Sequence, residues 1–354
     1  MSRLRRADPS SPGLARRRRG RGFEYLDETG SRVDEETSAR IRALAIPPAW
    51  EDVWICPVPN GHVQAVGTDA AGRRQYLYHP EWRRRRDREK FDEMVRFARA
   101  LPALREAAAR DLRRRGLVRE RVLACAVRLL DRGFFRIGTE GYAAENGTYG
   151  LATMKRQHVT LLRGGAVRFD YRSKGGRRRV QSIVDRDVFR VVEALVRRRS
   201  GEELLAYRSG RLWVDVTSDE INAYIKEITE DGFSAKDFRT WNATVLAAVA
   251  LAVSGEAHGS KTARTRAISR AVGEVAHYLG NTPAVCRASY IDPRVFDRFQ
   301  DGLTIGGALA ELGEGAPGEP ATQGAVEEAV LDLLERDVGS PALERLGRRG
   351  RRAS

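Results

Sequence analysis

The chain has 354 residues, of which 42% are hydrophobic and 31% are charged, so it has the length and composition of a soluble globular protein with a sizeable core. It carries 63 Lys and Arg residues against 48 Asp and Glu residues, and the resulting net charge of +15 favours a polyanionic partner, most simply nucleic acid. Since no apolar run is long enough to span a bilayer, we expect a cytoplasmic protein without a membrane partner.

Motifs for bound cofactors are missing from the sequence. The three cysteines, Cys56, Cys125 and Cys286, are far apart and lack the Cys/His spacing of a zinc site. Neither glycine-rich phosphate-binding motif occurs. We therefore expect chemistry that uses no metal and no other cofactor.

Residues 1–22 contain RLRR and ARRRRGRG without an apolar period, which predicts a disordered basic arm. Residues 23–85 alternate between apolar and polar positions and contain turn residues, which predicts a small antiparallel sheet domain. In its last strand, Gln75 and Leu77 share one face while Tyr76 and Tyr78 share the other. Because aromatic residues in strands usually pack, local sequence favours core tyrosines over tyrosines that contact a DNA groove.

Residues 86–312 are expected to form a mainly helical second domain. Apolar spacing predicts helices over residues 87–115 and 118–132. Arg136 follows, between Phe135 and Ile137, and must bury its stem while its guanidinium finds a partner. That partner is either an internal carboxylate, Glu140 or Glu145, or a phosphate.

Residues 158–184 alternate through three short strands, which predicts a β-meander with Lys174 at the tip of its second hairpin. Lys is rare in this arginine-rich chain and occurs at positions 90, 155, 174, 226, 236 and 261. An ammonium group can donate and recover a proton, whereas guanidinium stays protonated. Lys174 is therefore a candidate for proton transfer.

The chain then returns to helical spacing. Helices are expected at 186–199, at 219–230 with a Thr217-x-x-Glu220 capping box, at 243–253 and at 262–279. Arg239 lies just before the third of these and, as a buried charge, needs an anion. After the fourth, Gly280 and Asn281 favour a helix exit, and Thr282-Pro283 favours a new helix that presents Tyr290. Residues 313–354 are expected to form a Gly/Pro linker, a helix at 326–336 and a basic tail.

The ordered set Arg136, Lys174, Arg239, Asn281 and Tyr290 resembles the catalytic set of type IB DNA topoisomerases, in their poxvirus-like bacterial branch. The motifs that carry the resemblance are FFRIG, FDYRSKGG, KDFRTW and LGNTPAVCRASYI, together with IPPAW at 46–50 and GRRQYLYH at 72–79. The resemblance spans about residues 23–301. Many relatives have His where this chain has Asn281, and Lys236 occupies the first place of a box that reads H-x-x-R in the related tyrosine recombinases.

The resemblance implies an α+β fold, with a small antiparallel sheet domain before a mainly helical catalytic domain that contains the meander. It implies relaxation of supercoiled duplex DNA through a 3′-phosphotyrosine at Tyr290, without ATP or metal. Arg136, Arg239 and Asn281 would stabilise the phosphate, and Lys174 would protonate the leaving 5′ oxygen. Gln75, Tyr76, Tyr78, Arg172 and Lys236 would contact DNA, which reverses the local preference for packed tyrosines. A monomer would clamp the duplex in the bacterial cytoplasm, associated with the nucleoid.

Two other functions fit part of this pattern. A site-specific tyrosine recombinase shares the Arg, Lys, Arg and Tyr residues, but it needs a synapsing tetramer, and the QYLY sheet domain argues against it. A DNA-binding protein without catalysis explains the charge equally well, and it predicts that Tyr290→Phe changes nothing.

Overall fold

The computed structural model describes residues 3–255, 260–311, 322–337 and 339–345. The chain divides into two compact units, Met1–Asp92 and Glu93–Ser354. The division falls inside one long helix, α2 (Pro80–Leu112), which also contains the domain boundary expected after residue 85. Each unit has a buried core of its own.

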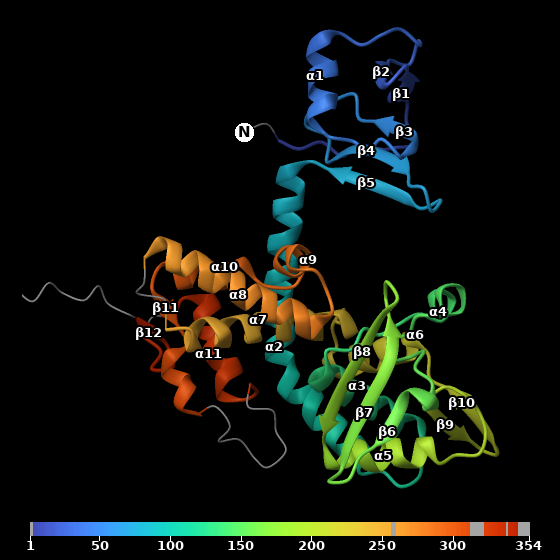
Figure 1. Cartoon of the computed structure of the whole chain (residues 1–354), viewed down its shortest axis with the longest axis vertical. Coiled ribbons are helices and arrows are strands. Elements are labelled where there is room, and N and C mark those ends of the chain that lie inside the picture. The colour runs from blue at the N-terminus through green and yellow to red at the C-terminus, as the bar shows by residue number, and fades with distance from the viewer. Residues whose placement is uncertain (1–2, 256–259, 312–321, 338, 346–354) are drawn as a thin grey trace, which may run out of the picture. The chain divides into compact units, whose positions relative to one another are not determined.

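The first unit is a five-stranded antiparallel sheet with one helix, drawn in blue in Figure 1. The strands are β1 (Leu14–Arg19), β2 (Gly22–Leu26), β3 (Glu51–Ile55), β4 (Val63–Thr68) and β5 (Arg74–Tyr78), in the order β2-β1-β3-β4-β5, and the helix is α1 (Glu35–Ala43). One face of the sheet buries Ile55 and Ala65 against Ile41 of α1, and Leu77 of β5 packs against the same cluster. Because side chains alternate along a strand, the neighbours of Leu77 face away from α1.

The expectation of a disordered arm over residues 1–22 is wrong. Within it, Leu14–Arg19 form β1, which pairs with both β2 and β3. Arg16 stacks over the ring of Phe23 at 4.2 Å and donates a hydrogen bond to the carbonyl of Pro47 at 3.0 Å. The arginine-rich composition predicted disorder because such stretches usually bury too little apolar surface to fold. Here Leu14 is part of the core and Arg16 is bound by backbone oxygens.

The second unit is mainly helical, as predicted. It contains most of α2, α3 (Arg119–Gly133), α4 (Glu140–Asn146), α5 (Arg186–Val196), α6 (Ser218–Thr229), α7 (Ala235–Val253), α8 (Lys261–Leu279), α9 (Pro283–Ser289), α10 (Pro293–Gln300), α11 (Ala325–Glu335) and the 3-10 helices η1 (Arg156–His158) and η3 (Gly306–Glu311). The expected capping box opens α6, with Thr217 and Glu220 each accepting the other's backbone N–H. Over the residues that the structure describes, no helix has both the length and the apolarity to cross a membrane.

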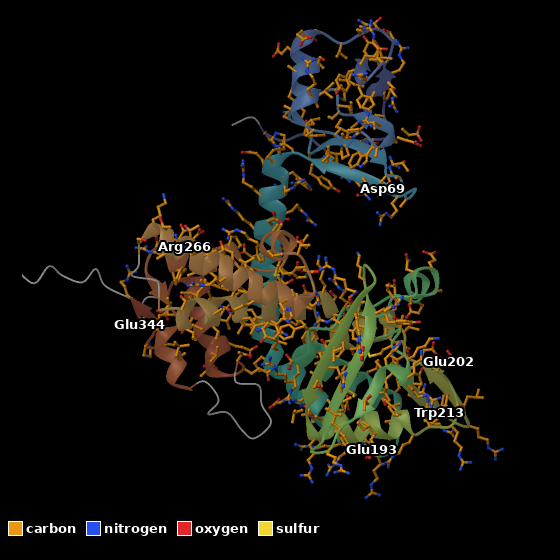
Figure 2. The ribbon with its side chains drawn as sticks, viewed as in Figure 1. Asp69, Glu193, Glu202, Trp213, Arg266 and Glu344 are labelled. Atoms are coloured by element: carbon orange, nitrogen blue, oxygen red, sulfur yellow. The ribbon has the colours of Figure 1, made fainter. Side chains whose placement is uncertain are left out.

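The predicted meander consists of β6 (Val159–Leu161), β7 (Ala166–Ser173) and β8 (Arg177–Val184), paired in that order. Its second turn carries Lys174, followed by Gly175 and Gly176 at φ of 80° and 73°, values that favour glycine. Two further pairs of strands were not predicted: β9 (Ala206–Ser209) with β10 (Leu212–Asp215), and β11 (Leu303–Thr304) with β12 (Glu344–Arg345). Trp213 of β10, labelled in Figure 2, lies beneath the guanidinium groups of Arg198 and Arg208.

Helix α7 begins eight residues earlier than the sequence predicts, at Ala235 instead of position 243. Ser234 and Asp237 form a capping box at its start, with the Asp237 carboxylate accepting the Ser234 N–H at 2.8 Å. Lys236 and Arg239 therefore lie in the first turns of the helix and are fixed by it.

The segment that leads to Tyr290 folds as the sequence predicts. Gly280 ends α8 at a φ of 63°. The side chain of Thr282 accepts the N–H of Val285 at 3.3 Å, and Pro283 is the first residue of α9. Tyr290 is the residue that ends this short helix, and Asp292 caps α10 directly after it.

The C-terminal helix α11, expected at 326–336, is bound to the body of the second unit by a buried polar network. Glu327 accepts hydrogen bonds from Arg105 of α2 at 2.9 Å and from the Trp241 indole of α7 at 2.7 Å. Arg105 also pairs with the buried carboxylate of Asp131 on α3 at 2.9 Å. Most of the linker expected at 313–324, and the basic tail at 348–352, lie outside the described residues.

Candidate active site

Four of the five expected catalytic residues line one pocket of about 300 Å³ in the second unit. They come from segments far apart in sequence: the loop after α3, the turn between β7 and β8, helix α7 and the end of α9. The residues are Arg136, Lys174, Arg239 and Tyr290, and Lys236, Thr148 and Tyr149 line the pocket beside them. A small cavity with several cations and a tyrosine is suited to a phosphoryl group.

The loop that carries Arg136 is held in place by packing on one side. Phe135 is fully buried and packs edge-to-face on Phe169 at 4.9 Å and stacks on Tyr171 at 6.3 Å, both from β7. Arg136 follows Phe135 directly, so the packing of this aromatic ring fixes the backbone from which the guanidinium extends.

Backbone contacts hold the same loop on its other side. The N–H of Leu151 donates to the carbonyl of Arg136 at 2.8 Å, and that of Ala152 donates to Ile137 at 2.7 Å. Gly138 and Gly150 touch backbone to backbone, so closely that a Cβ on Gly150 would lie 2.4 Å from the Cα of Gly138. The two glycines are therefore needed for the loop to reach the pocket.

Arg136 is bound to the turn between α8 and α9. Its Nη2 donates to the carbonyl of Gly280 at 3.2 Å and to Oδ1 of Asn281. The alternative of a salt bridge with Glu140 or Glu145 is wrong, because within the described part of the chain Arg136 pairs with neither carboxylate, and Glu140 instead accepts the N–H of Ser218 at 3.0 Å. The hypothesis that Arg136 binds a phosphate is compatible with the structure, because a guanidinium has five N–H donors and this turn uses only some of them.

Asn281 lies beside the pocket and not in its lining. Because its Oδ1 accepts from Arg136, its Nδ2 must point the other way. This Nδ2 is buried and has no hydrogen-bond partner among the described residues. Buried amide donors in folded proteins usually have a hydrogen-bond partner, so this unpartnered Nδ2 is an unusual feature beside the pocket.

Arg239 is the most deeply buried cation of the site, with only 4% of its surface exposed. Its guanidinium donates to the carbonyls of Phe134 and Leu279, the latter at 2.9 Å. Burial, and then the charge of Arg136, lower the pKa of Arg239 to about 10. Both causes penalise the positive charge, and an anion in the pocket would remove that penalty.

Tyr290 lies against Arg239, whose Cζ is 5.2 Å from the centre of the phenol ring. Burial raises the pKa of Tyr290, but Arg239, Arg136 and Lys236 outweigh it, so the pKa lies below that of an ordinary tyrosine. The chain just after Tyr290 is held by Thr244 of α7, whose hydroxyl oxygen accepts the N–H of Asp292 at 3.1 Å. Helix α7 therefore positions both the nucleophile candidate and its neighbouring cation.

The two residues of the second unit that were predicted to contact DNA, Lys236 and Arg172, lie in different places. Lys236, one turn before Arg239 on α7, is exposed and lines the same pocket as Lys174. Arg172 is exposed on β7 outside the pocket lining, and its carbonyl accepts the N–H of Tyr149 at 2.7 Å. Lys236 thus lines the pocket directly, whereas Arg172 supports the pocket wall through its backbone.

One residue beside the site was not predicted. Arg179 of β8 pairs in register with Tyr171 of β7 and donates to the carbonyl of Tyr278 at 2.6 Å. Its guanidinium lies so close to Gly280 that a Cβ there would meet Nη1 at 2.6 Å. The meander register could have placed Arg179 beside Tyr171, but its contact with the turn at Gly280 joins segments 99 residues apart and has no sequence signal.

In the first unit, Tyr76 and Tyr78 do not pack in the core. They are 41% and 39% exposed, and their rings stack 6.0 Å apart at 14°. Gln75 lies on the other face of β5, as the alternation predicts, and donates to Asp69 in the β4–β5 turn (Figure 2) at 2.9 Å. The three residues therefore do not share a face, and Gln75 is already bound to a carboxylate.

Comparisons with known proteins agree with this geometry. A family model described as the catalytic core of eukaryotic DNA topoisomerase I matches residues 79–304, and one described as the N-terminal domain of bacterial DNA topoisomerase IB matches residues 22–69. DNA topoisomerase 1B of Acanthamoeba polyphaga mimivirus is 28% identical over 297 residues, covering 82% of this chain and 88% of the relative. DNA topoisomerase 1 of Daucus carota is 29% identical over 160 residues, covering 45% of this chain and 19% of the relative.

Proposed function

Because the chain belongs to the type IB DNA topoisomerase family, we propose that the pocket of Arg136, Lys174, Arg239 and Tyr290 is its catalytic centre. The enzyme relaxes supercoiled duplex DNA by cutting one strand transiently through a 3′-phosphotyrosine and religating it without ATP. The observation that carries the assignment of the centre is a tyrosine with a lowered pKa in a small pocket lined by four cations.

In the cleavage step, the phenolic oxygen of Tyr290 attacks phosphorus and forms the tyrosyl ester. The bond from phosphorus to the 5′ oxygen breaks, and the 5′ side leaves as a free hydroxyl. The phenol gives up its proton to solvent water before or during attack, which its lowered pKa favours. Since one phosphodiester replaces another, the reverse attack by the 5′-hydroxyl restores the strand without added energy.

Arg136, Arg239 and Asn281 stabilise the negative charge on the non-bridging oxygens. The two guanidinium groups are held by backbone carbonyls and are therefore oriented before the substrate arrives. The Nδ2 of Asn281, oriented by Arg136, adds a neutral donor. An amide cannot take up a proton, so this position binds the phosphate and does not act as a base.

Lys174 is the proposed general acid for the leaving 5′ oxygen. It extends into the pocket from a hairpin turn, where a long side chain can follow the substrate. An alkoxide is a poor leaving group, and a positioned acid typically accelerates such a step by about 10² to 10⁴. Lys236, in the same pocket, contributes positive charge near Tyr290.

We further propose that a single chain is the active form and that both units contact the duplex. In support, every proposed catalytic residue belongs to the second unit of one chain, so no partner subunit is needed to complete the centre. Tyr76 and Tyr78 offer an exposed aromatic face in the first unit, and Arg172 and Lys236 are exposed in the second. The net charge of +15 and the match to a bacterial N-terminal domain support a place on the bacterial nucleoid.

Trapping the covalent intermediate tests the assignment of Tyr290. The native chain is mixed with supercoiled plasmid, quenched with detergent and digested, and the adduct peptide is identified by mass spectrometry. We expect a nucleotide on Tyr290 and a kinase-labelled 5′-hydroxyl at the break. Tyr290→Phe should give no adduct, while Tyr278→Phe, a change in an exposed neighbouring tyrosine, should keep it. An adduct on another residue, or one that persists in Tyr290→Phe, refutes the proposal.

A further inference from the structure

The residues before β1 are docked on the first unit by specific hydrogen bonds. The segment 3–9, here called the N-terminal strap, pairs in parallel with the chain at Gly61 through Arg5. The N–H of Arg5 donates to Asn60 and the N–H of His62 donates to Arg5, both at 2.9 Å. The strap thus forms a short backbone-paired segment beside residues 60–62.

Side chains hold the strap as well. The N–H of Ala7 donates to Nδ1 of His62 at 3.0 Å, and the amide of Asn60 donates to the carbonyl of Arg3 at 2.9 Å. A Cβ on Gly61 would lie 3.3 Å from the Cβ of Ala7, so the strap packs closely where glycine leaves room. These contacts give the strap a defined position relative to β4 and β5.

That position makes Arg6 one of the residues that line a groove of about 1090 Å³. The aromatic residues Tyr76, Tyr78 and Trp82 line the same groove, together with Arg83 and Arg86 from the start of α2. Arg6, Arg83 and Arg86 are all exposed. Aromatic faces next to several guanidinium groups suit a sugar-phosphate backbone, whose sugars contact the rings while its phosphates bind the cations.

Two carboxylates also line the groove, and both have partners. Asp8 accepts the N–H and the hydroxyl of Ser10, at 2.9 and 2.7 Å, within a turn of the strap. Asp87 lies 3.5 Å from the ammonium group of Lys90. With three arginines against these two acids, the groove keeps a positive balance.

We propose that the N-terminal strap is an additional DNA-binding element, in which Arg6 contacts a backbone phosphate beside Tyr76 and Tyr78. The proposal rests on the proposed contact of these tyrosines with DNA. The strap precedes both matched family regions, which begin at residues 22 and 79, so it extends the DNA-contacting surface beyond them.

The test measures duplex binding at several salt concentrations with the full chain carrying Tyr290→Phe, which removes the covalent step. Each phosphate contact contributes about 0.9 to the slope of log K against log salt. Arg6→Gln should therefore reduce the slope by about one and weaken binding. The control is Arg42→Gln, which removes the same charge from α1, where Arg42 is exposed and paired with Glu35. Helix α1 covers the sheet face opposite Tyr76 and Tyr78, so the control should keep the native slope.

A deletion of residues 2–7 separates a specific contact from general attraction. It removes Arg3, Arg5 and Arg6, yet it should lower the slope about as much as Arg6→Gln alone if Arg6 makes the contact. An unchanged slope for Arg6→Gln, or an equal loss for Arg42→Gln, overturns the proposal. Plasmid relaxation by the chain with intact Tyr290 is measured in parallel. If the native chain relaxes the plasmid but Arg6→Gln leaves the salt slope of binding unchanged, only the proposal for the strap is refuted. If the native chain does not relax the plasmid, the proposed function is refuted.

Discussion

The buried amide of Asn281 gives a test of how the phosphate is bound. In the structure, Oδ1 accepts a hydrogen bond from Arg136, and Nδ2 is buried without a hydrogen-bond partner among the described residues. Asn281→Asp has nearly the same shape and keeps an acceptor for Arg136, but it replaces the donor with a second acceptor that carries charge. Asn281→Ala removes both groups.

The expected effect follows from the loss of one donor to the transition state. Removal of such a donor typically lowers the rate by about 10² to 10³, or about 2.7 to 4 kcal/mol. Asn281→Ala should show a loss of this order. Asn281→Asp should lose at least as much, because two like charges about 4 Å apart repel by about 4 kcal/mol at an effective dielectric constant of about 20, and pairing with Arg136 offsets only part of this.

Single-turnover plasmid relaxation and detergent-trapped adduct, both at enzyme excess, measure the rates. The predicted order is native, then Asn281→Ala, then Asn281→Asp. If Asn281 served only to hold Arg136 through Oδ1, Asn281→Asp would keep most activity and exceed Asn281→Ala. That order would refute the role of Nδ2 as a phosphate donor.

Three further changes probe other parts of the site and fold. Because burial raises the pKa of Tyr290 and Arg239 is the leading group that lowers it, Arg239→Gln should move the alkaline rise of the cleavage rate to higher pH, and an unmoved profile contradicts this. Lys174→Ala should slow cleavage by about 10² to 10⁴, and a substrate with sulfur at the leaving 5′ position should restore the rate, since a thiolate leaves without a proton. Arg105→Met should lower the free energy of unfolding by about 3 to 5 kcal/mol, because two buried carboxylates lose their partner. Arg96→Gln is the control, because it breaks the more exposed Arg96–Asp231 pair, and it should change the free energy of unfolding by about 1 kcal/mol or less. Urea denaturation measures both variants.

Local signals in the sequence were sufficient where the chain's own neighbours determine the structure. The caps around Gly280, Thr282 and Pro283 follow from backbone preferences of those residues, so the approach to Tyr290 was predicted correctly. The meander and the position of Lys174 at its hairpin follow in the same way from alternation and two glycines.

Contacts between distant segments were not predictable in this way. Arg136 was expected to pair with a nearby carboxylate or a phosphate, but it is bound to Gly280 and Asn281, about 145 residues away. The strand β1 was not predicted because the partners of Arg16, the Pro47 carbonyl and the Phe23 ring, are supplied by other segments. Lys236 and Arg239 were placed before their helix because the polar first turn of α7 has no apolar period, although Ser234 caps it.

The edge strand β5 shows the limit of propensity. Aromatic residues in strands usually pack, which predicted buried Tyr76 and Tyr78, yet both are exposed because Leu77, between them, takes the core face. Their contact with DNA, inferred from the resemblance, stays a prediction.

Relaxation of supercoiled plasmid in EDTA and without ATP, by the native chain and by Tyr290→Phe, shows whether Tyr290 is the nucleophile of a metal-independent topoisomerase. We expect the native chain to relax the plasmid, and Tyr290→Phe to bind it with unchanged affinity but leave it supercoiled. Relaxation by Tyr290→Phe, or a native chain that binds the plasmid without relaxing it, would refute this role of Tyr290.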